Sequence, residues 1–227
     1  MRTPFGRLAR RPWRIPGVAM RIVTLPGVFR PRPDSWMLAR HLCARVHPGA
    51  HVLDLCTGSG AIAVAAARCG AGRVTAIDVS RRSVATARIN ARLNGVRVRA
   101  LRGDLFAPVA GERFDAIASN PPYLPAEDDA LPAHGPARAI DAGTDGRVLL
   151  DRICARAAEH LRPGGAVLLV HSDLIGLDVL YAVCDSLYDE FKRDEYAPPP
   201  LMKRMVALGH LGRKTGRGFY EYGANGR

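Results

Sequence analysis

The sequence lacks several features that would indicate particular classes of protein. It has no apolar run of eighteen residues, so no segment is predicted to cross a membrane. Its five cysteines are odd in number and show no Cys-x-x-Cys spacing, and its seven histidines are scattered. These patterns predict reduced thiols in a cytoplasm and argue against a metal site. The 227 residues, 48% of them hydrophobic, are enough for one sizeable core.

Acidic residues are scarce at the amino terminus. The net formal charge is +12, and residues 1–47 hold ten arginines against one acid, Asp34. Such an arm could bind phosphates by counterion release, and Trp13 among the arginines could stack on a base. A solvated tail in an arginine-rich chain is the alternative, because charge alone does not specify a partner.

A glycine-rich turn separates a buried-strand pattern at residues 51–55 from a helical pattern at residues 61–67. Such a turn lets the backbone approach a ligand at a helix N-terminus, which predicts a cofactor site. Asp78 lies eighteen residues beyond the second glycine, a spacing that also fits an NAD fingerprint. Asp54 favours S-adenosylmethionine, because a carboxylate repels a pyrophosphate but attracts the ammonium of an amino-acid cofactor. The turn consists of Cys56, Thr57, Gly58, Ser59 and Gly60.

Three successive strand patterns end at acids. Strands are predicted at 51–55, 73–78 and 96–102, with a helix at 80–93 that is capped by Ser80. The alternation predicts a parallel sheet, which binds ligands at the carboxyl ends of its strands. There Asp78 is expected to bridge ribose hydroxyls, and Asp104 with Leu105 to hold an adenine.

The tetrad Asn120-Pro121-Pro122-Tyr123 follows another buried strand pattern, at residues 114–119. It predicts a site for methylating a planar amine, whose delocalised nitrogen needs its hydrogens held by acceptors before it attacks. The Asn120 side chain and the Pro121 carbonyl can supply those acceptors, while the prolines stiffen the loop and Tyr123 offers a stacking face. A turn that ends a strand is the alternative.

Taken together, these motifs resemble the class I S-adenosylmethionine-dependent methyltransferases, and within them the release-factor glutamine methyltransferase family. The resemblance implies cofactor contacts at residues 56–60, Asp78, Leu105 and Asn120, with the substrate amide held by residues 120–123. Cys56 departs from the family, which has a glycine there, and is tolerable if its φ is negative. The family's helical substrate-recognition domain has no counterpart ahead of Leu25. The resemblance spans about residues 25–172 and rests on residues 26–35, 53–60, 76–78, 103–106, 119–123 and 142–146.

The composition changes after Ser172, since all three lysines and five of the six tyrosines lie beyond residue 180. Segments of this tail resemble the carboxy-terminal end of 3-hydroxyacyl-CoA dehydrogenases, without that family's catalytic His and Glu motifs. The tail is therefore predicted to be a fragment that replaces the last two strands of the methyltransferase sheet. A strand at 166–171 then becomes an edge, which a helix at about 176–191 would cover or use for dimerisation.

The sequence thus predicts an α/β fold: a Rossmann-like, mostly parallel class I methyltransferase sheet without its last two strands, and a helical C-terminal appendage. The predicted parts are a basic arm at 1–24, a methyltransferase domain at 25–172 and the tail at 173–227. The predicted activity is N-methylation of a glutamine side chain in a protein such as a release factor. The alternatives are methylation of an adenine or guanine amine in a nucleic acid, and a non-catalytic fusion that only binds cofactor. Acids at 127–129 would repel a phosphate backbone, which favours a protein substrate.

Overall fold

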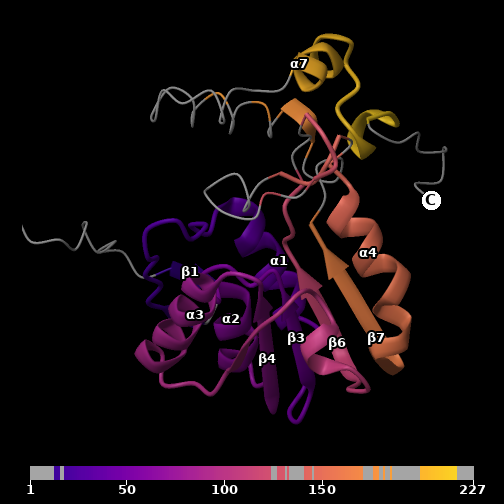
Figure 1. Ribbon diagram of the computed structural model, residues 1–227. Coiled ribbons are helices and arrows are strands. Elements are labelled where there is room, and N and C mark those ends of the chain that lie inside the picture. The colour runs from indigo at the N-terminus through magenta and orange to yellow at the C-terminus, as the bar shows by residue number, and fades with distance from the viewer. Residues whose placement is uncertain are drawn as a thin grey trace, which may run out of the picture. The chain divides into compact units, whose positions relative to one another are not determined.

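A computed structural model describes residues 13–15, 18–123, 127–130, 132, 141–144, 146–170, 176–178, 181, 185 and 200–218. The chain forms two compact units. The first unit consists of Met1–Pro121 and Arg152–Leu169, and the second of Pro122–Asp151 and Val170–Arg227. Figure 1 labels most of the elements of the two units. The predicted boundaries at residues 24 and 172 stay predictions.

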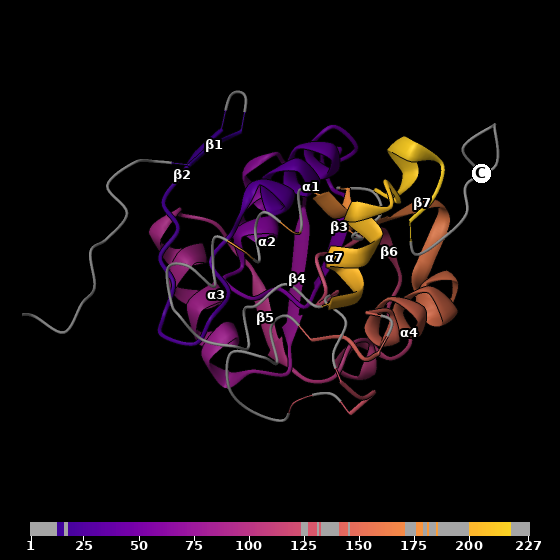
Figure 2. The same ribbon diagram turned by 90° about the horizontal axis from the view of Figure 1, so that it is seen from above.

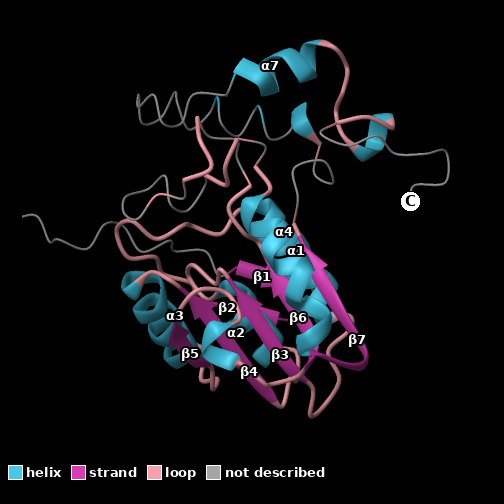
Figure 3. Ribbon diagram, turned by 45° about the vertical axis from the view of Figure 1, so that its right-hand side comes forward, coloured by secondary structure: helices cyan, strands magenta, loops and turns pink. Residues whose placement is uncertain are grey.

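A five-stranded sheet forms the centre of the first unit (Figure 3). The strand order is β5-β4-β3-β6-β7, and every neighbouring pair is parallel. Because the strand order reverses between β3 and β6, their carboxyl ends flank the position at which open α/β sheets bind ligands. The strands are β3 (His51–Leu55), β4 (Arg73–Asp78), β5 (Arg99–Arg102), β6 (Phe114–Ser119) and β7 (Leu161–Leu169).

Helices cover both faces of this sheet. Figure 2 shows α1 (Pro33–Cys43), α2 (Ala61–Arg68) and α3 (Arg81–Leu93) on one face, and α4 (Val148–Ala157) on the other. One apolar cluster joins α1, α2 and α3 to the chain that follows the short β1–β2 hairpin, whose strands are Trp13–Ile15 and Val18–Met20. Met20 and Ile22 are buried in that cluster, so this part of the predicted basic arm packs against the core.

The predicted parallel sheet is confirmed, and β3, β4 and β6 have the predicted bounds. Strand β5 begins at Arg99, three residues after the predicted start, because Val96 and Val98 pack against the helical cluster before the pairing begins. Strand β7 begins at Leu161 instead of residue 166, because a bulge in its pairing with β6 absorbs the glycines that resemble a turn.

Strand β7 is an edge within the described part of the chain, where no strand pairs with its outer side. The absence of the last two strands stays a prediction, because much of the tail lies outside the described residues. In the second unit, α7 spans Pro200–Ala207, and Leu177, Asp178, Tyr181 and Asp185 are helical. The rest of the predicted helix at 176–191, and position 171 of the predicted edge strand, lie outside the described residues. Covering of the edge by the tail stays a prediction.

The prediction that all five cysteines are reduced is wrong for one pair. Cys43 and Cys69 form a disulfide, with their Cα atoms 5.5 Å apart. Cys43 is the last residue of α1 and Cys69 caps the end of α2, so helix packing brings together two cysteines that are 26 residues apart in sequence. Cys56 and Cys154 are free thiols.

We expect Gly60→Ala to destabilise the protein by about 2–5 kcal/mol, the sum of backbone strain and overpacking. Gly60 has φ +78°, and a Cβ there would lie 2.7 Å from the Cα of Ala87 in α3. Gly70 is the matched control, because its φ is +102° but nothing lies within 4 Å of a Cβ built there. Gly70→Ala should therefore cost only about 1–2 kcal/mol. Urea unfolding measures both, and equal losses would contradict the close helix contact.

Candidate active site

The glycine-rich turn is fastened from beneath by Asp54, whose side chain is fully buried in the central strand β3. The Thr57 hydroxyl donates a hydrogen bond to Oδ2 of Asp54 at 2.5 Å, and the Ala63 N–H donates to the same oxygen at 3.1 Å. The other oxygen, Oδ1, is buried and has no hydrogen-bond partner among the described residues. Burial raises the pKa of Asp54 to about 7. A cation close to this carboxyl group would favour its charged form and lower its pKa again.

A second carboxylate, Asp78 at the end of β4, fastens the same turn from the side. Its Oδ2 accepts a hydrogen bond from the Gly58 N–H at 2.9 Å, and its Oδ1 accepts one from the Ser80 N–H at 2.8 Å. The Thr57 N–H donates to the Ile77 carbonyl at 3.0 Å, which also ties the turn to β4. Each carboxylate oxygen can accept further hydrogen bonds, so Asp78 can still reach a ligand.

Two predicted cofactor residues have left-handed backbones. Cys56 has φ +53° and Leu105 has φ +44°, and no other non-glycine residue in the described part of the chain has positive φ. The condition for tolerating a cysteine at position 56, a negative φ, is therefore not met, and Cys56 adopts the conformation that a glycine would adopt without strain. Backbone strain of this kind is concentrated at functional sites.

The Cys56 thiol is held in its protonated form. Burial raises its pKa, and the negative charge of Asp78 raises it further. A thiol is a weak nucleophile and a weak ligand for metals, so Cys56 contributes backbone geometry to the turn and no thiolate chemistry. Within the described residues, no group of three or more His, Cys, Asp or Glu side chains is arranged to hold a metal ion.

The third predicted acid is engaged at the surface. Asp104 lies two residues beyond the end of β5, and its exposed carboxylate forms an ion pair with Arg152 of α4. The neighbouring Leu105 is buried. The roles of both residues in holding an adenine stay predictions.

The Asn120 side chain has a fixed orientation. It follows β6, and its Nδ2 donates to Oδ2 of Asp34 at 2.9 Å and to the Ser35 hydroxyl at 3.1 Å. Both N–H groups of the amide therefore face the start of α1, and Oδ1 faces the other way. That oxygen is buried and has no hydrogen-bond partner among the described residues. A buried acceptor without a donor costs free energy, which indicates a place reserved for a ligand N–H.

Sequence reasoning gave Asp34 and Ser35 no role at the site, although both lie in the segment 26–35 that carries the family resemblance. They are 86 and 85 residues from Asn120 in sequence, and their side chains are buried. Two adjacent polar side chains at a helix start are typical of a cap, so their spacing alone does not reveal that they hold an asparagine.

The tetrad is divided between the two units. Asn120 and Pro121 belong to the first unit, while Pro122 and Tyr123 belong to the second. Tyr123 packs in the second unit against Met202, which is fully buried in α7, and near Tyr181. The stacking role of Tyr123 stays a prediction. The residues that the first unit brings together are Asp54, the turn 56–60, Asp78, and Asn120 with its two partners.

We expect Asp54→Asn to remove a pH dependence of stability. Because the pKa of Asp54 is raised from 3.8 to about 7, the folded protein keeps a proton that the unfolded chain loses. The free energy of unfolding from this group therefore falls as pH rises from about 4 to about 7. Asparagine keeps an acceptor oxygen and does not ionise. The free energy of unfolding of the variant should therefore rise relative to that of the parent by at most about 4 kcal/mol over this range.

Urea unfolding between about pH 2 and pH 8 measures this difference, and Asp115→Asn is the control, with the opposite sign and a pH dependence that lies below about pH 4. Burial would raise the pKa of Asp115, but the hydrogen bond from the His51 N–H and the charge of Arg162 outweigh burial and lower it. The free energy of unfolding of Asp115→Asn should therefore fall relative to that of the parent as pH rises. Parallel pH profiles for the two variants would contradict the assignment.

The left-handed backbone at Cys56 predicts an order of stability among its variants. Cys56→Gly should stay within about 1 kcal/mol of the parent, because glycine adopts this φ without strain. Cys56→Val should lose more than about 2 kcal/mol, because a β-branched side chain tolerates positive φ poorly. Cys56→Ala, which removes only the thiol, should lie between them. Thermal unfolding gives the order, and a valine variant as stable as the parent would refute the strained geometry.

The chain resembles known proteins in two separate segments. Residues 19–133 match the family described as Methyltransferase small domain. Residues 163–222 match the 3-hydroxyacyl-CoA dehydrogenase, C-terminal domain, which confirms the predicted resemblance of the tail. This second match begins inside β7, ten residues before the predicted boundary at 173.

Individual relatives agree with the first match. The release factor glutamine methyltransferase of Gloeobacter violaceus is 44% identical over 155 residues, which cover 63% of this chain and 54% of the relative. The ribosomal protein uL3 glutamine methyltransferase of Bradyrhizobium diazoefficiens is 44% identical over 131 residues, 54% of this chain and 41% of the relative. The chain thus spans about half the length of these curated relatives.

Among solved structures, the T. thermophilus 16S rRNA N2 G1207 methyltransferase, in complex with AdoMet and guanosine, has a TM-score of 0.56 and 28% identity. The similarity covers 74% of this chain and 43% of that structure. With 115 of its 227 residues matched by the family, this chain belongs to the methyltransferase small domain family.

Proposed function

We propose that this protein is an S-adenosylmethionine-dependent N-methyltransferase whose substrate is a glutamine side chain in another protein. The observation that carries the proposal is the side-chain oxygen of Asn120, which is buried and lacks a donor among the described residues. Asp34 and Ser35 hold the N–H groups of the same amide, so the oxygen remains available to a substrate N–H.

This arrangement suits a planar amide nitrogen. In a carboxamide the nitrogen lone pair is delocalised into the carbonyl, so the nitrogen is a poor nucleophile in its resting geometry. The Asn120 Oδ1 would accept one N–H of the substrate, and the Pro121 carbonyl would accept the other. Two fixed acceptors orient the lone pair toward the methyl donor and stabilise the positive charge that develops on nitrogen. The methyl donor would be left as a neutral thioether, and the extra proton on the nitrogen would pass to water.

The residues around the turn fit S-adenosylmethionine, which when bound supplies a methyl group on a positively charged sulfur. The cofactor's ammonium would supply the cation that the buried Asp54 oxygen lacks among the described residues. Asp78 and the Gly58–Gly60 backbone would take the ribose and the adjoining part of the cofactor. Asp104 and Leu105 would take the adenine. A pyrophosphate beside Asp54 would find no cation there and would oppose ionisation of this carboxyl group, which argues against NAD.

The names of the relatives support a protein substrate, since one relative is named for a release factor and another for ribosomal protein uL3. A release factor works on the ribosome, so this substrate would place the enzyme in the cytoplasm. The Cys43–Cys69 disulfide removes the argument for that location that rested on reduced thiols. No helix among the described residues is long and apolar enough to span a membrane. Methylation of a guanine amine is the second candidate, because the similar T. thermophilus structure is named for rRNA and contains guanosine.

Asn120→Ala tests the proposal. We expect the rate of methyl transfer to fall by about a hundred-fold or more, because one fixed acceptor of the attacking nitrogen is lost. Cofactor affinity should fall only modestly. Asn94→Ala is the control, since Asn94 bonds the backbone of Arg21 far from the tetrad in sequence and should leave the rate unchanged.

The measurement is transfer of a radiolabelled methyl group to a release factor, to uL3 and to ribosomal RNA, followed by protease or nuclease treatment. Acid hydrolysis of the labelled protein would identify methylated glutamine. Label that disappears with nuclease would replace the proposed substrate by a nucleic acid. Unchanged turnover in Asn120→Ala would remove this residue from the mechanism.

A further inference from the structure

One surface of the first unit carries a high positive charge. Residues 79–103, which form α3, β5 and their flanking turns, contain seven arginines and no aspartate or glutamate. The whole chain has 33 basic and 21 acidic residues, and this stretch holds seven of the basic residues and none of the acidic ones. All seven arginines are exposed: Arg81, Arg82, Arg88, Arg92, Arg97, Arg99 and Arg102.

Three of these arginines form a single row along α3. Arg81, Arg88 and Arg92 are separated by seven and four residues, which places them within roughly 40° of one another around the helix axis. The row is about 16 Å long at the helical rise per residue. Ala85, the residue between them on the same row, is exposed and too small to shield the charges. We call these three arginines, together with Arg102 at the end of β5, the α3 basic row.

Backbone carbonyls hold two members of the row in place. The Arg88 Nη2 donates to the Ala100 carbonyl at 2.7 Å, and the Arg102 Nε donates to the Val79 carbonyl at 3.1 Å. A neutral carbonyl fixes a guanidinium without cancelling its charge. Arg81 and Arg92 form no ion pair with any carboxylate of the described residues.

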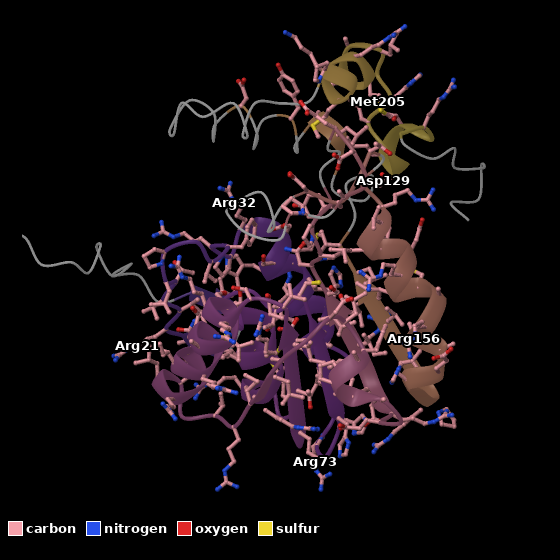
Figure 4. The ribbon with its side chains drawn as sticks, in the orientation of Figure 1. Arg21, Arg32, Arg73, Asp129, Arg156 and Met205 are labelled. Atoms are coloured by element: carbon pink, nitrogen blue, oxygen red, sulfur yellow. A yellow bond between two sulfur atoms is a disulfide. The ribbon has the colours of Figure 1, made fainter. Side chains whose placement is uncertain are left out.

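Two further arginines lie close to the row, one on the opposite face of the sheet and one at the end of α3. Ala100 packs against Val84 and Ala87 of α3, so Arg99, the preceding residue of β5, points to the opposite face. Arg99 forms an ion pair with Glu112 at 2.7 Å, which compensates its charge. Arg21 adds a further cation at the α3 end, because its backbone bonds to Asn94, and Figure 4 shows its side chain directed outward.

We propose that the α3 basic row binds the phosphate backbone of a nucleic acid. Arginine forks match phosphate oxygens, and several along a row release several counterions when they meet a polyanion. Protein interfaces centre on buried apolar anchors, and the row contains none. The exposed apolar residues of α3, Ile89 and Leu93, lie to one side of it by helical periodicity. This site is independent of the proposed methylation chemistry and lies outside the predicted basic arm.

The test measures binding of the full chain to a labelled single-stranded RNA of twenty nucleotides by fluorescence anisotropy, from about 50 to 200 mM salt. The variant Arg81→Gln/Arg92→Gln removes two charges of the row that have no ion pair among the described residues. We expect about tenfold weaker binding at low salt and a salt slope reduced by about 1.4, since each single-strand phosphate contact contributes about 0.7.

The control Arg97→Gln/Arg99→Gln removes the same charge from β5 and the segment just before it, and should weaken binding much less. Equal weakening by the two variants would mean that net charge alone attracts the RNA and would overturn the site. Displacement of the RNA by polyglutamate at equal charge would also overturn it, in favour of an acidic protein. Duplex DNA replaces the RNA in a second series to decide which nucleic acid binds more tightly.

Circular dichroism checks that both variants fold, and Arg92→Gln alone is the substitute if the double variant does not. The expected slope change is then about 0.7. Methyl transfer to a release factor is followed in the same samples and should not change. Loss of RNA binding with intact methyl transfer therefore separates this proposal from the proposed function.

Discussion

The candidate site depends on the way two carboxylates hold one glycine-rich turn. Asp54 fixes the turn from inside the central strand through Thr57 and Ala63, and Asp78 fixes it from the adjacent strand through Gly58. These bonds connect β3, β4 and the start of α2, so the strand ends are held in register with the turn. The buried Asp54 is costly to ionise, so a ligand cation that pairs with it must offset this desolvation cost.

A comparable constraint acts on the other side of β3. The bonds from Asn120 to Asp34 and Ser35 join the end of β6 to the start of α1, and they determine which way the amide faces. An asparagine free to rotate would present its N–H groups and its oxygen in turn, and would select poorly for an N–H of the substrate. The start of α1 therefore orients this acceptor oxygen as much as the tetrad does.

The dehydrogenase-like match and the glycine-rich turn involve separate segments of the chain. The dehydrogenase-like match begins within β7, and the described sheet ends at that strand. All the residues that fasten the turn come from β3, β4 and the segments next to them, which precede the match. The hydrogen bonds that join Asp54 and Asp78 to the turn therefore do not require any strand beyond β7. In the second unit, Tyr123 packs with α7, so the tetrad's aromatic residue is in contact with the tail.

Local patterns in the sequence were enough to predict the strands β3, β4 and β6 and the glycine turn, and to place Asp54, Asp78 and Asn120 at or near strand ends, because period, turn residues and strand ends are local features. The left-handed backbone at Cys56, the start of β7 and the Cys43–Cys69 bond follow instead from tertiary packing. The contact of Asp34 with Asn120 likewise joins residues 86 positions apart. These features arise from the packing of segments distant in sequence, which no local pattern specifies.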